Sequence, residues 1–549
     1  MIERVRINGF RCLRDVDFKP RPTRNILVGP NASGKSTVLD AIGLALTGRL
    51  NGRPAAEALN PFWFNLGIVR DFFAGRKAGE AVAPPTIKIE LFLKDQDELQ
   101  RLVGVHHSLG DSSSHPGITF EVFPNPEFVN ELEQQLVDGE LLPTEYYMTS
   151  WRNFGDGPLY ARPKAISTAI IDGRTIRSFA GIDFHMKQIL DEHLSAEDKA
   201  QIAVDFRTVK LEMEKKHLSE INDSLATDDF TLGPESFGLG MDQTRGTAWD
   251  AHVIPTVDQV PFAQSGLGMQ AAVKVTLAVG RNSDEARVLM IEEPENHLSH
   301  TTLNQLLARI DQEAGKEQQY FVTTHSSFVL NRLGLNSLTF VTDGDVQKGF
   351  EISAESTSYF QRQPGYDSLR LVIAPRVILV EGPSDEMIVE RVFADKYKKS
   401  PIEMDVDVVC LRGTSFRRGL ELATALDKPC AAIRDNDGKD HAHWAEPLEQ
   451  YLSDSRKLFV GPVHAGTTLE SQVTFANEDA RLRGLLSLAG DENAEAWMID
   501  NKTEAAFRIA SSSQPFTPPE YLREAIEFIL QQSPPHPRRR RIWKNHPDR

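Results

Sequence analysis

The stretch NILVGPNASGKST, at residues 25–37, decides the fold of the N-terminal part of this chain. Its apolar residues 26–28 predict a buried strand, and STVLDAIGLAL predicts a helix directly after it. Between them, residues 29–36 fit the pattern G-x-x-x-x-G-K-[ST], in which glycines let the backbone wrap closely around phosphate groups. We therefore expect an ATP-binding loop, in which Lys35 reaches the β- and γ-phosphates and Ser36 contributes a ligand to Mg²⁺. The nucleotide-binding residues predicted in this loop are Asn31, Gly34, Lys35, Ser36 and Thr37.

A loop of this kind requires an acidic partner, and RVLMIEEPENHL at residues 287–298 provides one. The apolar residues 288–291 predict a buried strand that ends at Glu292 and Glu293. We expect Glu292 to orient the Mg²⁺ of the nucleotide and Glu293 to position the attacking water or accept its proton. The alternative is a pair of surface glutamates in a turn before a helix.

Two weaker signals accompany the acidic strand end. YFVTTHSSFVL places His325 after another apolar strand, where a histidine can contact the γ-phosphate. AQSGLGMQ offers Ser265, Gly266 and Gly268 ahead of a helix, whose N-terminus can also face phosphate. A lone histidine is more often structural, so His325 is predicted to contact nucleotide only because the loop and the acidic strand are also present.

A second acidic constellation follows two apolar strands near the C-terminus. RVILVEGPSDE ends one strand at Glu381, with Asp385 in the next helical turn, and CAAIRDNDG ends another with Asp435 and Asp437. Residues i and i+2 of an extended strand point to the same side, and parallel strands end at the same edge of a sheet. Carboxylates gathered there repel one another unless hard cations neutralise them, which predicts a Mg²⁺ or Mn²⁺ site. Alternatively, Asp385 stabilises a helix N-terminus and DNDG is simply a turn.

The composition fits a soluble α/β protein rather than a membrane protein or a disulfide-rich one. Of 549 residues, 40% are hydrophobic and 25% charged, and no apolar run approaches the length of a membrane span. The three cysteines form no CxxC pair, which favours a reducing cytoplasm. The net charge of −17 means that any nucleic acid must be bound by local basic patches.

Strands that alternate with helices predict an α/β chain with parallel sheets, organised in five parts. Helical spacing within the second part is compatible with either a solvated helix pair or a dimerisation element. The parts are an ATPase N-terminal part (1–100), a mainly helical insertion (101–255), an ATPase C-terminal part (256–370), a second α/β domain (371–512), and a helix with a basic tail (513–549).

The nucleotide-binding motifs resemble the SMC and RecF branch of the ABC ATPases. The resemblance rests on the N-terminal strands, GPNASGKST, EEPENHL and TTHSSF. It implies that SGLGMQ is a degenerate signature motif that contacts the γ-phosphate bound to a second protomer, and hence a homodimer. The chain departs from the pattern in having no LSGGQ, and in having Glu292 where most members have aspartate.

Glu381 together with Asp435-x-Asp437 resembles the TOPRIM domain of topoisomerases, primases and OLD-family nucleases. A TOPRIM domain behind an SMC-like ATPase looks like the OLD (overcoming lysogenisation defect) endonucleases, whose relatives include the GajA subunit of Gabija anti-phage systems. The resemblance implies that Glu470 in GTTLESQV is a further metal ligand and that Lys502 in DNKTEAAFRIA is the catalytic lysine.

These resemblances predict an ATP-regulated, metal-dependent DNA endonuclease that acts in anti-phage defence or DNA processing. The alternatives are an ATP-gated TOPRIM ribonuclease that attacks RNA such as tRNA, and a non-nucleolytic ATPase scaffold. The expected partners are DNA, a second copy of the chain and, if the protein is of the Gabija type, a UvrD-like helicase. The predicted catalytic residues are Glu381, Asp435, Asp437, Lys502 and Glu293, and the predicted metal ligands are Glu381, Asp385, Asp435, Asp437, Glu470 and Ser36.

Overall fold

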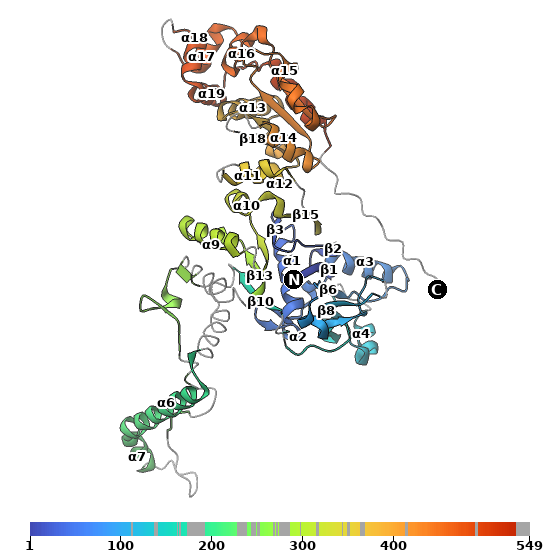
Figure 1. Ribbon diagram of the computed structural model, residues 1–549, viewed down its shortest axis with the longest axis vertical. Coiled ribbons are helices and arrows are strands. Elements are labelled where there is room, and N and C mark those ends of the chain that lie inside the picture. The colour runs from blue at the N-terminus through green and yellow to red at the C-terminus, as the bar shows by residue number, and fades with distance from the viewer. Residues whose placement is uncertain are drawn as a thin grey trace. The chain divides into compact units, whose positions relative to one another are not determined.

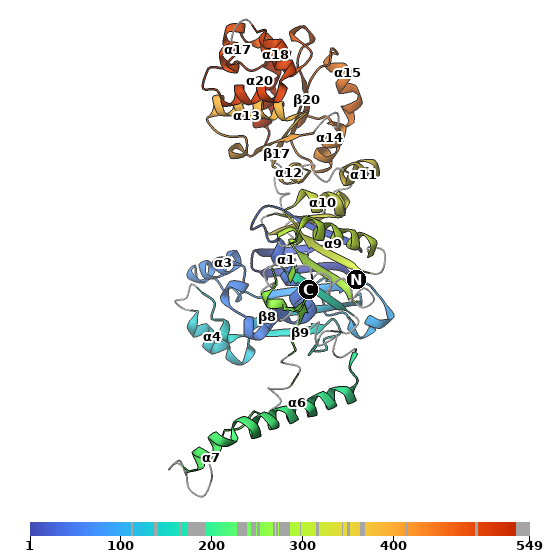
Figure 2. The same ribbon diagram turned by 90° about the vertical axis from the view of Figure 1, so that its left-hand side faces the viewer.

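The chain forms two compact units of mixed helices and strands, which confirms the α/β class (Figures 1 and 2). The first unit contains Met1, Leu39–Trp63 and Ile89–Tyr320, and the second contains Ile2–Val38, Phe64–Lys88 and Phe321–Arg549. The computed structural model describes residues 1–110, 113–136, 141–161, 163, 166–172, 193–227, 239–242, 249, 253–266, 269–270, 273, 286–296, 298–313, 318–342, 344–348, 352–362, 368–411, 416–488 and 492–533.

Two long strands of the first unit correct one of the expectations. β8 (His115–Pro124) pairs antiparallel with β9 (Tyr147–Asn153), and the register runs from Ile118↔Asn153 to Pro124↔Tyr147. The alternate residues Ile118, Phe120 and Val122 are buried, as the two-residue period of a strand requires. The expectation of a mainly helical segment from residue 101 is therefore wrong for the first part of that segment. The alternation of buried and exposed residues is short and lies between polar loops, so the sequence pattern did not indicate a strand.

A long helix does occur further along the same region. α6 (Ala196–His217) begins after Ser195, whose Oγ accepts a hydrogen bond from the backbone N–H of Asp198 at 3.1 Å. Such a cap satisfies one of the free N–H groups at a helix start. None of the residues of α6, all of which the structure describes, is buried. The helix thus presents its apolar side chains to solvent, and its role in dimerisation stays a prediction.

A parallel strand pair of the first unit carries the acidic strand end. β10 (Ser167–Asp172) lies parallel to β13 (Ala286–Glu292), with Ile170 opposite Met290. Residues 288–291 of β13 are buried, as their apolar character predicts. The other helices and strands of this unit include β4 (Arg49–Leu50), β5 (Arg53–Pro54), α2 (Ala55–Ala58), β7 (Val103–Gly104), α4 (Val129–Gln135), α7 (Ser219–Thr227), β11 (Thr256–Val257), β12 (Val260–Pro261) and α9 (His300–Glu313).

The second unit contains the strand that leads into the predicted nucleotide loop. β3 (Arg24–Val28) is buried from Asn25 onward and lies parallel to β15 (Leu338–Thr342), with Ile26 opposite Leu338. The other elements of this part are β1 (Ile2–Phe10) and β2 (Leu13–Phe18), which pair antiparallel, α3 (Leu66–Lys77), α10 (Ser327–Leu333), β16 (Asp345–Lys348), α11 (Ala354–Arg362) and α12 (Ser368–Ile373). The elements α1 (Lys35–Thr47), β6 (Ile87–Leu93) and β14 (Gln319–Thr323) contain residues of both units.

The C-terminal part of the second unit is built on a four-stranded parallel sheet in the order β18-β17-β19-β20. Its central strands are almost wholly apolar, as expected for a parallel sheet covered on both faces. The strands are β17 (Arg376–Val380), β18 (Val406–Cys410), β19 (Cys430–Arg434) and β20 (Arg456–Val460). The helices are α13 (Pro383–Tyr397), α14 (Phe416–Ala425), α15 (His441–Ala445), α16 (Leu469–Ala476), α17 (Asp479–Leu486), α18 (Ala494–Asp500), α19 (Lys502–Ser511) and α20 (Glu520–Gln531).

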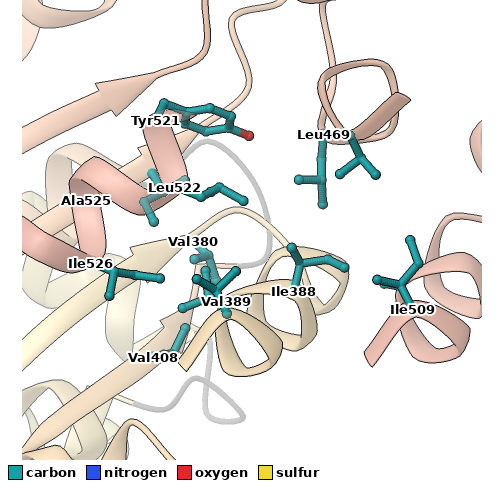
Figure 3. Close-up of a cluster of buried hydrophobic side chains, with 14 of the residues drawn as sticks. Val380, Ile388, Val389, Val408, Leu469, Ile509, Tyr521, Leu522, Ala525 and Ile526 are labelled. Atoms are coloured by element: carbon teal, nitrogen blue, oxygen red, sulfur yellow. The ribbon is translucent and has the colours of Figure 1, made fainter. Parts of the chain in front are cut away.

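The core of this part joins helices that are far apart in sequence. Ile388 of α13, Ile509 of α19 and Ile526 of α20 are each no more than 1% exposed and lie in one apolar cluster with the sheet (Figure 3). α20 was expected to stand outside the second α/β domain, and this expectation is wrong, because its apolar face forms part of the core. No helix within the described residues is long and apolar enough to cross a membrane.

Shortening a core side chain of α20 should therefore destabilise the C-terminal domain. For Ile526→Ala we expect a loss of about 2–4 kcal/mol in the free energy of unfolding, from lost burial and the remaining cavity. Urea unfolding followed by circular dichroism measures this change. Glu524→Ala, on the exposed face of the same helix, is the matched control and should change stability by less than about 0.5 kcal/mol. Equal effects of the two substitutions would contradict the packing of α20.

Candidate functional site

Four predicted acidic residues come together beyond the carboxyl ends of the central strands. Glu381 follows β17 directly and Asp435 follows β19 directly, and these two strands are parallel neighbours. Asp385 lies in the first turn of α13, and Glu470 lies in the first turn of α16. Glu381, Asp385 and Glu470 all raise the pKa of Asp435 by charge repulsion, which shows that the four carboxylates are electrostatic neighbours.

Asp385 caps the start of a helix and also lies buried near other carboxylates. Its Oδ2 accepts a hydrogen bond from the backbone N–H of Gly382 at 3.0 Å, so it does stabilise the start of α13. Yet the side chain is only 7% exposed, and burial, with repulsion from Glu381 and Glu470, raises its pKa to about 7. A carboxylate that merely capped a helix in solvent would have no such shift.

Asp435 is the most perturbed of the four carboxylates. Burial, followed by repulsion from Asp385, Glu381 and Glu470, raises its pKa to about 8. Burial also raises the pKa of Glu381. Asp435 Oδ1, Glu381 Oε1 and Glu470 Oε2 are buried and have no hydrogen-bond partner among the described residues. Buried oxygens normally have partners. Glu381 Oε1 lies 3.6 Å from Arg434 and Glu470 Oε2 lies 3.5 Å from Lys502, so these two oxygens have a cationic neighbour beyond hydrogen-bond distance. Asp435 Oδ1 therefore gives the clearest indication of a missing cationic or donating group.

The donor set fits a hard divalent cation. Carboxylate oxygens are the ligands that Mg²⁺ and Mn²⁺ prefer, and the three unpartnered oxygens would gain from a cation. The spacing is not that of a filled site, since no group of three or more His, Cys, Asp or Glu side chains in the described part of the chain is already arranged to hold a metal ion.

Asp437 reaches the site by a different route from the one expected. It does not continue the extended strand, because β19 ends at Arg434 and Asp437 has a left-handed φ of 49°. Asn436 holds this turn, since its Nδ2 donates to the carbonyls of Gly461 at 3.0 Å and Gly466 at 2.7 Å. The argument from strand geometry is therefore wrong for Asp437, and DNDG is a turn. Asp437 nevertheless raises the pKa of Glu381 by repulsion, so the two carboxylates are neighbours.

Sequence reasoning missed three further residues at this site, namely Arg434, Asn436 and Tyr521. The guanidinium of Arg434 lies 3.6 Å from Glu381 and 3.4 Å from Asp437. Tyr521 of α20 is buried, and its burial, with repulsion from the surrounding carboxylates, raises its pKa well above the ordinary value. Arg434 and Asn436 are adjacent to the acidic motif, but neither belongs to a recognisable sequence motif. Their contacts are visible only in the folded structure.

Lys502 lies next to the acidic cluster. It is the first residue of α19, its side chain is half-exposed, and its Nζ lies 3.5 Å from Glu470 Oε2. The far end of α19 is fixed by Arg391, which donates to the carbonyls of Ile509 at 2.7 Å and Ser512. The ammonium group therefore stands beside the carboxylates on a helix whose other end is anchored, although its catalytic role stays a prediction.

The predicted phosphate loop has the backbone that its sequence requires. A Cβ on Gly29 would lie 1.9 Å from the carbonyl oxygen of Val341, and Gly34 has a left-handed φ of 108°. Lys35 is 5% exposed, and its Nζ donates to the carbonyls of Gly29 at 2.9 Å and Pro30 at 2.8 Å. The side chain of Lys35, at the start of α1, is thus held by the backbone carbonyls of the loop.

The remaining loop residues and His325 lie in the same unit. Asn31, before Gly34, is exposed. After Gly34, Ser36 is half-buried and Thr37 is buried in the first turn of α1. His325 is exposed, follows β14, and borders the same pocket as Pro30 of the loop. The position of His325 therefore agrees with a residue that faces nucleotide, although its contact with phosphate stays a prediction.

Four further residues predicted for the nucleotide site lie in the first unit. Glu292 is the last residue of β13, and Glu293 follows it with a left-handed φ of 43° while its side chain accepts a hydrogen bond from Asn296. The carbonyl of Gly266 accepts from the backbone N–H of Gln270 at 3.0 Å, which is a helical turn. Ser265 Oγ donates to the carbonyl of Phe262, and Gly268 lies outside the described residues. The roles of these residues stay predictions.

Comparisons with known families agree with both motifs. Residues 4–111 match the AAA domain family, and residues 189–331 match a second AAA domain family. Residues 373–437, which include Glu381, Asp385, Asp435 and Asp437, match the family described as Overcoming lysogenization defect protein-like, TOPRIM domain. The chain joins AAA-type ATPase domains to an OLD-like TOPRIM domain. The resemblance to OLD proteins is confirmed, whereas a closer relation to GajA stays a prediction.

Individual relatives match to different extents. An OLD nuclease of Thermus scotoductus is 22% identical over 581 aligned residues, which cover 97% of this chain and 99% of that protein. A DNA replication and repair protein RecF of Magnetococcus marinus is 38% identical over 68 residues, so the chain spans 18% of that relative's length and the match covers 12% of this chain. The solved C-terminal region of the Burkholderia pseudomallei OLD protein is 20% identical, with a TM-score of 0.23, and covers 29% of this chain and 97% of that structure.

The raised pKa of Asp435 predicts how stability varies with pH in the absence of divalent ions. The unfolded carboxyl titrates near 3.8 and the folded one near 8, so the folded state holds an extra proton between these values. Stability from this group is therefore complete below about pH 4 and is lost as the pH rises towards about 8. We expect Asp435→Asn, which cannot ionise, to be more stable than wild type by about 1–3 kcal/mol at pH 8 in EDTA.

Urea unfolding at pH 5 and pH 8 in EDTA measures this effect. The advantage of Asp435→Asn should shrink towards pH 5, where the native carboxyl is protonated. Asp454→Asn, a substitution of an exposed aspartate on the same domain, is the matched control and should follow wild type at both pH values. An Asp435→Asn variant with the same stability difference at both pH values would contradict the raised pKa.

Proposed function

We propose that this chain is an ATP-regulated, metal-dependent nuclease that hydrolyses phosphodiester bonds of DNA. One observation carries the proposal: three buried carboxylate oxygens without hydrogen-bond partners meet at the edge of an OLD-like TOPRIM sheet. The similarity to an OLD nuclease along nearly the whole chain supports the same reaction class. DNA is favoured as substrate because the short ATPase match is to a DNA replication and repair protein.

The acidic side chains would hold the divalent ions. Asp385 and Glu470 are buried, Glu381 and Asp435 are half-buried, and Asp437 extends the set towards solvent. A bound Mg²⁺ or Mn²⁺ would supply Lewis-acid activation of the phosphodiester and of water. The carboxylates themselves would orient the ions.

Lys502 would act on the substrate rather than on the ions alone. Its ammonium group is half-exposed at the start of α19, so it can move from Glu470 to a phosphate oxygen. A positive charge aimed at that oxygen stabilises the negative charge that grows during hydrolysis. We assign Lys502 this electrostatic role, with Glu470 as its partner in the absence of substrate.

The phosphate loop and the acidic strand end would bind and hydrolyse ATP in order to regulate cleavage. Lys35 and Ser36 supply the phosphate and metal contacts that the loop motif requires, and Glu292 and Glu293 supply the acidic strand end. A second copy of the chain would complete the nucleotide site, as the SMC-like resemblance implies. Action in anti-phage defence, a helicase partner and a cytoplasmic location belong to this proposal as further predictions.

Substitution of Asp435 tests the nuclease directly. Asp435→Ala should lower plasmid cleavage in Mg²⁺ or Mn²⁺ by at least about 10³-fold, because it removes the ligand at the centre of the cluster. A gel assay of supercoiled, linear and single-stranded DNA, with tRNA alongside, measures the rate. Asp454→Ala on the same domain is the matched control and should cut like wild type.

The same assay separates the competing functions. Cleavage of tRNA but not DNA would favour a ribonuclease, and no metal-dependent cleavage of either would favour a scaffold. An Asp435→Ala protein that cuts as fast as wild type would exclude this carboxylate site as the nuclease centre. Lys35→Ala should keep the metal requirement of cleavage while it loses the response to ATP.

Substitution of Lys502 tests its proposed role in the reaction. Lys502→Met should slow cleavage by about 10²-fold or more, because the charge that stabilises the reacting phosphate is lost. Binding of Mn²⁺ should stay within a few-fold of wild type, since the carboxylates remain. Lys399→Met, at an exposed position of the same domain, controls for loss of a surface charge. A variant that cuts normally would show that Lys502 serves only as a partner of Glu470.

A further inference from the structure

Arg434 places one permanent positive charge inside the acidic cluster. It is the last residue of β19, and its side chain is only 6% exposed. Its Nη2 atom lies 3.6 Å from Glu381 Oε1 and 3.4 Å from Asp437 Oδ2. A guanidinium stays protonated at any physiological pH, so its single positive charge offsets part of the charge of these two carboxylates whether or not a metal ion is present.

The guanidinium is also held firmly in this position. Its central carbon lies 3.3 Å from the centre of the Trp444 ring and 5.6 Å from that of Phe416. Its Nε donates to the carbonyl of Asp435 at 3.2 Å, and Trp444 Nε1 donates to the carbonyl of Asn436 at 3.0 Å. Stacking on an aromatic face, together with these hydrogen bonds, opposes any movement of the charge away from the cluster.

The cluster is therefore divided into two halves of unequal charge. Glu381 and Asp437 contact the fixed guanidinium. In the other half, Asp435 Oδ1 and Glu470 Oε2 have no hydrogen-bond partner among the described residues. Glu470 is accompanied only by the half-exposed Lys502, whose long flexible stem allows it to leave.

We propose that Arg434 is a built-in cation that makes this cluster bind its two divalent ions unequally. The inference rests on the proposed metal site. The first ion enters the half formed by Asp385, Asp435 and Glu470, where the nearby cation is the half-exposed Lys502, which can move away. The second ion must share Glu381 and Asp437 with Arg434, so it binds more weakly because it breaks ion pairs and faces a like charge.

A purely structural role for Arg434 is the competing explanation. The stack on Trp444 would then only pack the end of β19, and removing the charge would lower stability without changing how metal ions are distributed. Substitutions that separate charge from packing distinguish the two. Arg434→Gln removes the charge, Arg434→Lys keeps it, and Trp444→Leu removes the aromatic support while the arginine remains.

Titration of the full chain with Mn²⁺, in the absence of nucleotide and with free ion measured by electron paramagnetic resonance, tests the proposal. Wild type should show one tight and one weaker ion. Arg434→Gln should bind the weaker ion about tenfold or more tightly, because two carboxylates lose their competing cation. Arg434→Lys should keep the two affinities unequal, and Trp444→Leu should tighten the weaker ion to an intermediate extent.

Thermal melting in EDTA and in Mn²⁺ accompanies the titration as a second readout. The rise in melting temperature caused by Mn²⁺ should be larger in Arg434→Gln than in wild type. If Arg434→Gln binds both ions with wild-type affinity while Asp435→Ala binds neither, the proposed role of Arg434 is overturned and the metal site itself is not. Wild-type binding in Asp435→Ala would instead overturn the metal site and the proposed function. If Arg434→Gln does not fold, unchanged affinities in Trp444→Leu overturn the proposal.

Discussion

Repulsion among carboxylates at one edge of a parallel sheet is the physical constraint that the C-terminal domain has to accommodate. Glu381 and Asp435 meet because their strands are parallel neighbours, and the first turns of α13 and α16 add Asp385 and Glu470. Burial makes this repulsion strong, since water cannot screen the charges. The backbone N–H group of Gly382 at the start of α13 donates to Asp385 and so lowers the cost of this repulsion.

The surrounding fold keeps the carboxylates together despite this cost. α13, α19 and α20 bury their apolar faces in one core beneath the sheet, so the elements that carry Asp385 and Lys502 share a common support. Arg391 ties α13 to the end of α19 through backbone carbonyls. Reactive groups on anchored helices and strand ends are positioned more exactly than groups on loops. Stability from the apolar core thus offsets a polar site that opposes folding.

The sequence was sufficient for features that have a local pattern. The loop around Lys35 and the acidic residues after β13, β17 and β19 all follow short apolar runs, and the structure has these strands. Glu470 and Lys502 came only from the family resemblance, because neither has a local signal. Asp437 was placed on a strand because the chain's left-handed turn depends on contacts from Asn436 to residues far along the sequence.

The raised pKa values of Asp385 and Asp435 also link the proposed metal site to the pH. Asp385 titrates near 7 and Asp435 near 8, so around neutrality the cation-free site stores protons. A divalent ion can enter only as those protons depart, and acid conditions favour their return. In the proposed site, protons and divalent ions would therefore compete for the same carboxylate oxygens. Occupancy by magnesium or manganese would then depend on both the pH and the concentration of the ion.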